Sequence, residues 1–224
     1  MTLTTLVFDA YGTLFDVAGA ARQAAAETPA LAELWPRLAA DWRAKQLEYT
    51  WLRAITGDYR DFAGVTADAL DWAMERHGVE AALRGRMLAL YDVLPAFAEV
   101  AGVLAQLQGQ ARLAILSNGT PAMLAAAVSH AGLDGVFEAV LSVDALRTYK
   151  PADAVYDMVQ ANMGVARSEV MFVSSNGWDA AGAARYGFRT VWVNRMGLPG
   201  DRLGAGPWQT LSDLSALPAV WATA

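Results

Sequence analysis

The sequence predicts an α/β protein in which a parallel sheet carries a helical insertion after its first strand. Short apolar runs alternate with helical patterns along the second half of the chain, which is typical of strands joined by crossover helices. The runs are continuous rather than alternately polar, as expected when helices cover both faces of a sheet. No strand pattern occurs between residues 16 and 92. With 224 residues, 55% of them hydrophobic, the chain is long enough for a core and a smaller inserted unit.

The first predicted strand is the apolar run of residues 3–8, and the helical insertion follows it. Apolar residues at three- and four-residue spacing predict a long helix over residues 29–57. Two further helices are predicted over residues 66–78 and 80–91. The insertion, or cap, therefore spans residues 16–92.

The rest of the chain, residues 1–15 and 93–224, forms the predicted core. Predicted helices cover residues 95–107, 121–131, 153–163 and 179–186. Predicted strands cover residues 113–116, 136–141, 170–173 and 190–193. The last segment, residues 197–224, is rich in Gly and Pro and is expected to wrap the surface.

Composition and charge exclude several classes of partner and chemistry. The net charge is −6, with 17 basic and 23 acidic residues mixed along the chain, so the sequence offers nucleic acid no basic surface. The longest apolar runs are strand-sized, and we expect no transmembrane helix, membrane partner or secretory signal. The chain has no cysteine, which removes disulfides, thiolate metal ligands and a thiol nucleophile, and fits a cytoplasmic protein.

Two common hydrolase mechanisms are also disfavoured. The two histidines, His77 and His130, each lie within two residues of a glycine, where a helix end is predicted and a cation is favoured. Neither follows a strand, and the chain has no Gly-x-Ser-x-Gly segment, so a Ser-His-Asp hydrolase is not expected. A phosphate-binding Gly-x-x-x-x-Gly-Lys loop is missing as well.

Polar segments follow predicted strands at four points along the chain. They are Asp9-Ala10-Tyr11-Gly12-Thr13, Ser117-Asn118-Gly119-Thr120, Lys150-Pro151 and Ser174-Ser175-Asn176-Gly177-Trp178-Asp179. Because the carboxyl ends of parallel strands share one edge of a sheet, the four segments are expected to form one pocket. Asp9 is the candidate nucleophile. An isolated Asp-x-x-Gly more often ends a turn, but the three other segments favour the functional interpretation.

In order and spacing, these four segments resemble the motifs of the haloacid dehalogenase superfamily, and the resemblance covers nearly the whole chain. It implies an α/β fold with a Rossmann-like, doubly wound parallel sheet and an all-helical cap inserted after the first strand. It also implies that Asp9 is a nucleophile that forms an ester intermediate. One fold hosts many reactions, so the branch of the superfamily depends on other residues.

Tyr11 distinguishes between the branches. Phosphatases of the superfamily are known for Asp-x-Asp at this point, where the second carboxylate protonates the leaving group. A phenol, with an ordinary pKa of about 10, is a poor replacement for that acid. Asp9-Ala10-Tyr11 instead resembles the (S)-2-haloacid dehalogenases. The segment from Trp42 to Arg53 resembles the cap helix of that branch, and its Arg43 matches the arginine that contacts the halide.

The fourth segment predicts that no metal or other cofactor takes part. Magnesium prefers several oxygen ligands with negative charge among them. This segment offers Ser174, Ser175 and Asn176 before its acid, Asp179, and a lysine is expected nearby. The resemblance to the dehalogenase branch, which uses no metal, implies the same.

The chemistry of halide displacement suits these residues. A halide leaves as an anion and needs no proton, so a second acid beside Asp9 is unnecessary. Asp9 would attack the α-carbon from the side opposite the halogen, which forms an ester and inverts the centre. Lys150 is expected to keep Asp9 ionised and in line, although a lysine before a proline is also an ordinary surface residue.

Substrate binding is assigned to polar loops and an apolar wall. Ser117 and the loop amides around Tyr11 and Asn118 are expected to bind the substrate carboxylate. Arg43 and Asn118 would receive the departing halide. The expected apolar wall consists of Leu47, Phe62 and Trp178, although aromatic residues at helical spacing are more often simple core.

Hydrolysis of the ester needs water and a base. Asp179 is the candidate base, with Ser174 and Asn176 orienting it and supporting the lysine. Asp179 also suits the N-cap of the following helix, and both roles stay open. Thr13 and Tyr156 match supporting positions of the family, one near Asp9 and one beside the lysine loop.

We therefore expect a hydrolase acting on carbon–halide bonds that converts short (S)-2-haloalkanoic acids to (R)-2-hydroxy acids. One alternative is a magnesium-dependent phosphatase of the same superfamily, and another is a catalytically silent member that binds a halocarboxylate without releasing halide. A homodimer is also expected, because Trp35, Trp51 and Trp72 provide more aromatic surface than three cap helices need. Sedimentation equilibrium showing a monomer at micromolar concentration would contradict the dimer.

Overall fold

The computed structural model describes residues 2–224 and contains a six-stranded sheet in the order β3-β2-β1-β4-β5-β6. Every neighbouring pair of strands is parallel. The strands are β1 (Thr5–Phe8), β2 (Arg112–Ser117), β3 (Ala139–Ser142), β4 (Val170–Ser174), β5 (Arg189–Val193) and β6 (Gln209–Leu211). The predicted α/β fold class is confirmed.

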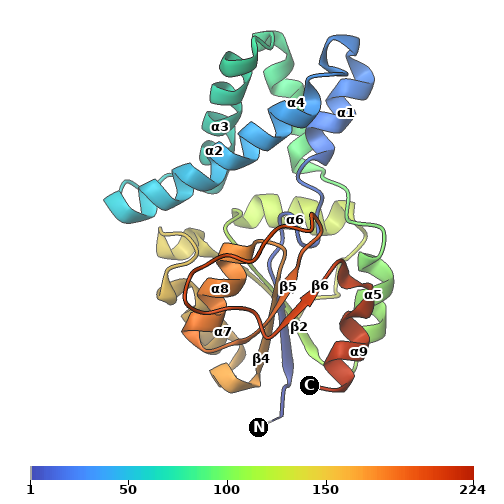
Figure 1. Cartoon of the computed structure of the whole chain (residues 1–224), viewed down its shortest axis with the longest axis vertical. Coiled ribbons are helices and arrows are strands. Elements are labelled where there is room, and N and C mark those ends of the chain that lie inside the picture. The colour runs from blue at the N-terminus through green and yellow to red at the C-terminus, as the bar shows by residue number, and fades with distance from the viewer. Residues whose placement is uncertain (1) are drawn as a thin grey trace.

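Helices cover both faces of this sheet and form a separate group at one end of the molecule. They are α1 (Gly19–Glu27), α2 (Trp35–Thr56), α3 (Phe62–His77), α4 (Arg84–Asp92), α5 (Val100–Leu107), α6 (Pro121–His130), α7 (Asp153–Met163), α8 (Gly177–Tyr186) and α9 (Leu217–Ala222). Figure 1 shows α7 and α8 on one side of the sheet, α5 and α9 on the other, and α1–α4 together at the end away from both termini. All residues of β1 and β4 are buried, which explains their unbroken apolar runs.

The segment that leaves the core after β1 pairs with the segment that returns to it before α5. Phe15 forms an antiparallel bridge with Ala96, and the Asp16 amide donates to the Pro95 carbonyl at 2.9 Å. We propose that the chain divides beside this pairing, into a core of residues 1–15 and 93–224 and a cap of residues 16–92. The grouping of α1–α4 in Figure 1 supports this division.

Several element boundaries differ from the predictions for local reasons. Helix α3 begins at Phe62, not at the predicted Thr66, because the Asp61 side chain caps it by accepting from the Gly64 amide at 2.7 Å. Helix α1 was missed because its buried face consists of a glycine and alanines, which are too small to mark an apolar stripe in the sequence. The Gly- and Pro-rich final segment contains β6 and α9 as well as loops.

The three tryptophans behind the homodimer prediction are each partly buried within the chain. The Trp51 ring packs edge-on against Trp178 at 5.3 Å between centroids, and the Lys45 ammonium lies 4.6 Å from the Trp72 ring centroid. The homodimer stays a prediction. Within residues 2–224, no helix is both long and apolar enough to cross a bilayer.

Candidate active site

The candidate site lies where the strand order of the sheet reverses. Strands β1 and β4 are neighbours, with β2 on the other side of β1, so the loops after β1 and β4 diverge from one point at the carboxyl edge. Asp9 follows β1 directly, and its amide donates to the Val173 carbonyl of β4 at 2.9 Å. Ligands of doubly wound proteins bind at this kind of crevice, so the topology alone presents Asp9 to a substrate.

Lys150 bridges two buried carboxylates. Its Nζ lies 3.0 Å from Asp9 Oδ1 and 3.0 Å from Asp179 Oδ2. Lys150 is 1% exposed and Asp179 is 0% exposed. Burial alone would lower the pKa of Lys150, but the carboxylates of Asp179 and Asp9 outweigh it and raise that pKa above its ordinary value. The ammonium therefore stays charged and pairs with both acids.

The Asp179 carboxylate accepts from three side chains. Ser174 Oγ donates to Oδ2 at 3.0 Å, beside Lys150, and the Tyr156 hydroxyl donates to Oδ1 at 2.8 Å. Complete burial raises the pKa of Asp179, and the Lys150 ammonium acts in the opposite direction. The N-cap interpretation was wrong, because α8 begins two residues earlier than predicted and its N-cap is Asn176.

The second oxygen of Asp9 is also held by donors. Thr13 Oγ1 donates to Asp9 Oδ2 at 3.0 Å, and Asn176 Nδ2 donates to the same oxygen at 2.9 Å. Thr13 Oγ1 itself accepts from the Ser175 amide at 2.8 Å, which ties the loop after β1 to the loop after β4. The carboxylate is 8% exposed as a side chain, so it is held in one orientation at the edge of the crevice.

Arg43 extends from the cap to both of these core loops. Its Nη2 donates to the Tyr11 carbonyl at 3.2 Å and to Asn176 Oδ1 at 3.1 Å, and its Nη1 donates to Gln46 Oε1 at 2.7 Å. Burial raises the pKa of the Tyr11 phenol well above its ordinary value, which makes the phenol a still weaker acid. The Tyr11 side chain is therefore unsuited to protonating a leaving group.

Side chains of the loop after β2 form hydrogen bonds to the Lys150 backbone and within their own turn. Asn118 Oδ1 accepts from the Lys150 amide at 3.1 Å, and Ser117 Oγ accepts from the Gly119 amide at 3.1 Å. Gly119 also lies against the Tyr11 ring, because a Cβ on this residue would be 2.7 Å from Tyr11 Cε2. The sheet thus brings together the four segments that the sequence separates.

The three predicted wall residues occupy two places. Leu47 and Trp178 line a cleft of about 580 Å³ between cap and core, together with Arg43 and Asn176. Phe62 lies apart from that lining and packs on Tyr11, with 5.6 Å between the ring centroids. Phe62 is 2% exposed and is therefore a buried core residue.

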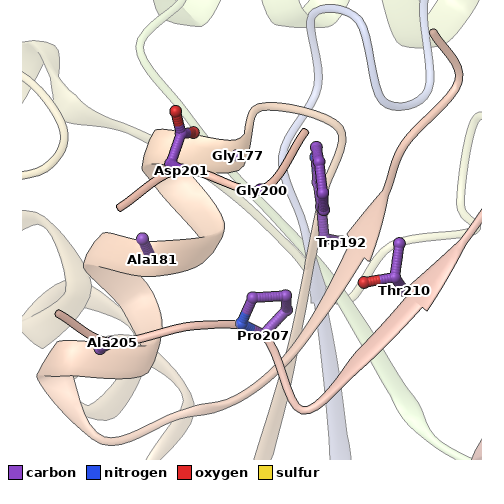
Figure 2. Close-up of a pocket in the computed structure, with 8 residues that line it drawn as sticks. All are labelled: Gly177, Ala181, Trp192, Gly200, Asp201, Ala205, Pro207 and Thr210. Atoms are coloured by element: carbon purple, nitrogen blue, oxygen red, sulfur yellow. The ribbon is translucent and has the colours of Figure 1, made fainter. Parts of the chain in front are cut away.

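A second pocket of about 320 Å³ lies beside this cleft. Figure 2 shows it between α8 and strands β5 and β6, with Trp192 on one wall and Asp201 beside Gly177. Eight of the described residues line this pocket, and none of these eight is a predicted catalytic or substrate-binding residue. Arg43, Leu47, Asn176 and Trp178 thus line the cap–core cleft and not this second pocket.

Comparison with known proteins identifies the family. The family model of haloacid dehalogenase-like hydrolases matches residues 3–187, which is most of the chain. The chain belongs to this family. It is 40% identical over 222 residues to the (S)-2-haloacid dehalogenase of Pseudomonas sp. (strain YL), covering 98% of this chain and 94% of that protein. It is 44% identical over 196 residues to the (S)-2-haloacid dehalogenase of Xanthobacter autotrophicus, covering 87% and 76%.

A solved relative extends the comparison to three dimensions. The L-2-haloacid dehalogenase from Xanthobacter autotrophicus with chloropropionic acid covalently bound matches this dehalogenase-like hydrolase with a TM-score of 0.89. The two share 36% identity, and the match covers 98% of each chain. The family resemblance inferred from the four segments is confirmed.

Some residues of this dehalogenase-like hydrolase that contact the site were missed by the sequence analysis. Gln46 lay in the quoted cap segment, but no motif distinguishes it from other helical glutamines. Arg195 follows β5, donates to the Thr13 carbonyl at 2.9 Å and pairs with Glu99 at 2.7 Å. Arg195 follows a predicted strand, as the other site residues do, so the same criterion would have predicted it as a site residue.

Gly182 offers a test of how tightly Tyr156 is held in this hydrolase. A Cβ on Gly182 would lie 2.8 Å from the Tyr156 hydroxyl and 2.7 Å from Pro151 Cβ. We expect Gly182→Ala to displace Tyr156 from Asp179, to cost about 1–3 kcal/mol of stability and to lower activity. Gly102→Ala, in a helix with open space around the added methyl, is the control and should leave both unchanged or slightly raise stability. Equal melting temperatures and activities for the two variants would contradict this packing.

Proposed function

We propose that this chain is an (S)-2-haloacid dehalogenase that hydrolyses short 2-haloalkanoic acids to (R)-2-hydroxy acids. The observation that carries the proposal is the pairing of Asp9 with the Lys150 ammonium at 3.0 Å, in a segment with a tyrosine where a phosphatase has its second acid. The (S)-2-haloacid dehalogenases that this chain resembles over nearly its full length support the same reaction.

In the first step Asp9 displaces the halide. A carboxylate oxygen attacks the α-carbon opposite the halogen, a carbon–oxygen bond forms, and the halide leaves with the bonding electron pair. No proton moves, so the step needs no general acid. Lys150, Thr13 and Asn176 donate to the carboxylate and hold it in line, which removes much of the orientational cost of attack.

The substrate is held at both of its polar ends. Ser117 and the loop amides near Tyr11 and Asn118 bind the carboxylate of the acid, while Arg43 and Asn118 receive the halide. Arg43 suits this task because a guanidinium carries a permanent charge with several donors in one plane. The apolar contacts come from Leu47 and Trp178, whereas Phe62 packs behind Tyr11.

In the second step water hydrolyses the ester. Asp179 takes a proton from water, the oxygen attacks the Asp9 carbonyl carbon, and the bond to the substrate oxygen breaks. The substrate oxygen takes the proton held by Asp179, and the second proton of the water leaves the new Asp9 carboxyl for solvent, which regenerates both carboxylates and releases the hydroxy acid. Burial raises the pKa of Asp179, and a raised pKa makes a carboxylate a better base. Ser174 donates to Asp179 at 3.0 Å and accepts from the Asn176 amide at 3.2 Å, which orients the base.

We propose that neither step uses a metal or other cofactor. The carboxylates of Asp9 and Asp179 share the Lys150 ammonium, whose positive charge takes the place of a metal ion. Within residues 2–224, no three or more His, Asp or Glu side chains are grouped to hold a metal ion. The donor set thus suits an anionic substrate with Lys150 and Arg43 as the positive groups.

Halide release from each enantiomer of 2-chloropropionate, measured in excess chelator, tests the proposal. We expect halide from the (S) form alone, with the (R)-hydroxy acid as product. Phosphate release from a generic phosphate ester, only when magnesium is added, would instead identify the phosphatase alternative. Saturable binding of 2-chloropropionate without halide release would identify a catalytically silent protein.

A further inference from the structure

Gln46 is a buried amide in the cap that makes direct contact with Arg43. It lies on α2 and is 1% exposed. A primary amide has one acceptor oxygen and a nitrogen with two hydrogens, and each costs free energy if it is buried without a partner. The partners around Gln46 therefore determine which way the amide faces.

The neighbouring hydroxyls determine that orientation. Thr66 Oγ1 donates to the Phe62 carbonyl at 2.6 Å, which uses its one hydrogen, so it can only accept from Gln46. Gln46 Nε2 donates to Thr66 Oγ1 at 2.7 Å and to the Tyr91 hydroxyl at 3.0 Å. The nitrogen thus faces α3 and α4. The oxygen accepts from Arg43 Nη1 at 2.7 Å, and the Tyr91 hydroxyl lies farther from it, at 3.3 Å.

This orientation fixes the guanidinium of Arg43 from the cap side. A guanidinium is planar, so an acceptor at Nη1 sets the direction of the remaining donors. Nη2 then donates to the Tyr11 carbonyl and to Asn176 Oδ1, and the Nδ2 of the same Asn176 side chain donates to Asp9 Oδ2. A continuous chain of hydrogen bonds joins the buried cap amide to the nucleophile.

We propose that Gln46 is a positioning residue that sets the direction in which Arg43 presents its donors to the leaving halide. The proposal rests on the proposed function, because it assigns Arg43 to the halide. Gln46 itself touches neither substrate nor halide and acts through Arg43. A long arginine that is only half-buried has other conformations available, and the amide removes them.

Gln46→Met tests the proposal, because methionine has a similar length and only a weakly accepting sulfur in place of the amide oxygen. We expect kcat/KM for (S)-2-chloropropionate to fall about tenfold or more, the loss typical of a hydrogen bond to a charged group. Chloride is a poorer leaving group than bromide and depends more on Arg43. The ratio of bromo- to chloropropionate kcat/KM should therefore rise by roughly threefold or more, as an interaction made in the transition state requires. Product inhibition by chloride should weaken in parallel.

Two controls separate positioning from stability. Thr50→Val removes another buried polar group of α2, whose hydroxyl donates to the Leu47 carbonyl of the same helix. It should lower the melting temperature without changing the bromide-to-chloride ratio. In an Arg43→Lys background, Gln46→Met should add little further loss, since the residue that it positions is gone.

The outcomes distinguish failure of the proposed function from failure of the positioning role alone. A wild-type protein that releases no halide would overturn the proposed function and, with it, this role of Gln46. An active wild type combined with an unchanged leaving-group ratio in Gln46→Met, or with full additivity to Arg43→Lys, would overturn the positioning role alone. If Gln46→Met does not fold, Tyr91→Phe removes one partner of the amide and should shift the ratio in the same direction by a smaller factor.

Discussion

Asp9→Asn should reduce halide release from (S)-2-chloropropionate by about 10⁴-fold or more, the scale of loss seen when a catalytic nucleophile is removed. An amide has no anionic oxygen with which to displace a halide. It also has one acceptor oxygen in place of two, while Lys150, Thr13 and Asn176 all donate to this position. In the variant, the side-chain NH₂ group at position 9 therefore faces at least one of these three donors. The side chain loses both its negative charge and its fixed orientation.

The matched control for this variant is Asp134→Asn, at an exposed aspartate in the turn after α6. Its rate should equal that of the wild type. Mass spectrometry of the assayed Asp9→Asn protein has to show that the new side chain remains an amide, because deamidation would restore the nucleophile. Substantial halide release from an Asp9→Asn protein whose amide is intact would show that another residue or water performs the displacement.

Lys150→Met should lower activity by about a hundredfold or more, because it removes the positive charge that faces Asp9. It should also lower the free energy of unfolding at pH 7 by about 3–5 kcal/mol. The reason is that the buried carboxylates of Asp9 and Asp179 lose the ammonium that lies 3.0 Å from each. Urea unfolding and halide release measure the two effects.

The stability loss in Lys150→Met should depend on pH in a predictable direction. Burial raises the pKa of Asp179, and the variant removes the ammonium that opposes this rise. A carboxyl whose folded pKa exceeds its unfolded pKa costs stability at a pH above the folded value, and this cost shrinks as the pH falls from the folded towards the unfolded value. The difference in unfolding free energy between wild type and variant should therefore shrink from pH 7 towards pH 4.

Lys45→Met provides the control for the pH series. The Lys45 ammonium pairs with the partly exposed Glu48 at 2.9 Å, so the change should cost less than about 1 kcal/mol with little pH trend. A stability difference in Lys150→Met that stays constant between pH 4 and pH 7 would contradict the carboxylate explanation.

Much of the fold was predictable because its signals are local. The apolar run before Asp9 is β1, and the helix predicted over residues 153–163 is α7, which ends at Gly164 in a left-handed conformation with φ of 65°. The start of α3 was mispredicted because Asp61, Thr66 and other polar residues compete for the cap, and only packing of Phe62 in the interior decides between them.

The candidate site likewise has features that the sequence predicts and features that only packing decides. The order of apolar runs and turn residues by itself determined that Asp9, Ser117, Lys150 and Ser174 meet at one edge, because parallel strands align their carboxyl ends whatever their separation in sequence. It also determined the family, since motif residues follow the strands in a fixed order.

Only the tertiary structure decided how the side chains share their partners. That Lys150 bridges two acids, that Asp179 accepts from Tyr156 instead of capping α8, and that Gln46 faces Arg43 depend on helices far apart in the chain. The physical reason is that strand pairing follows from local sequence and topology, whereas the partner of a long polar side chain depends on which donors and acceptors its neighbours have already used.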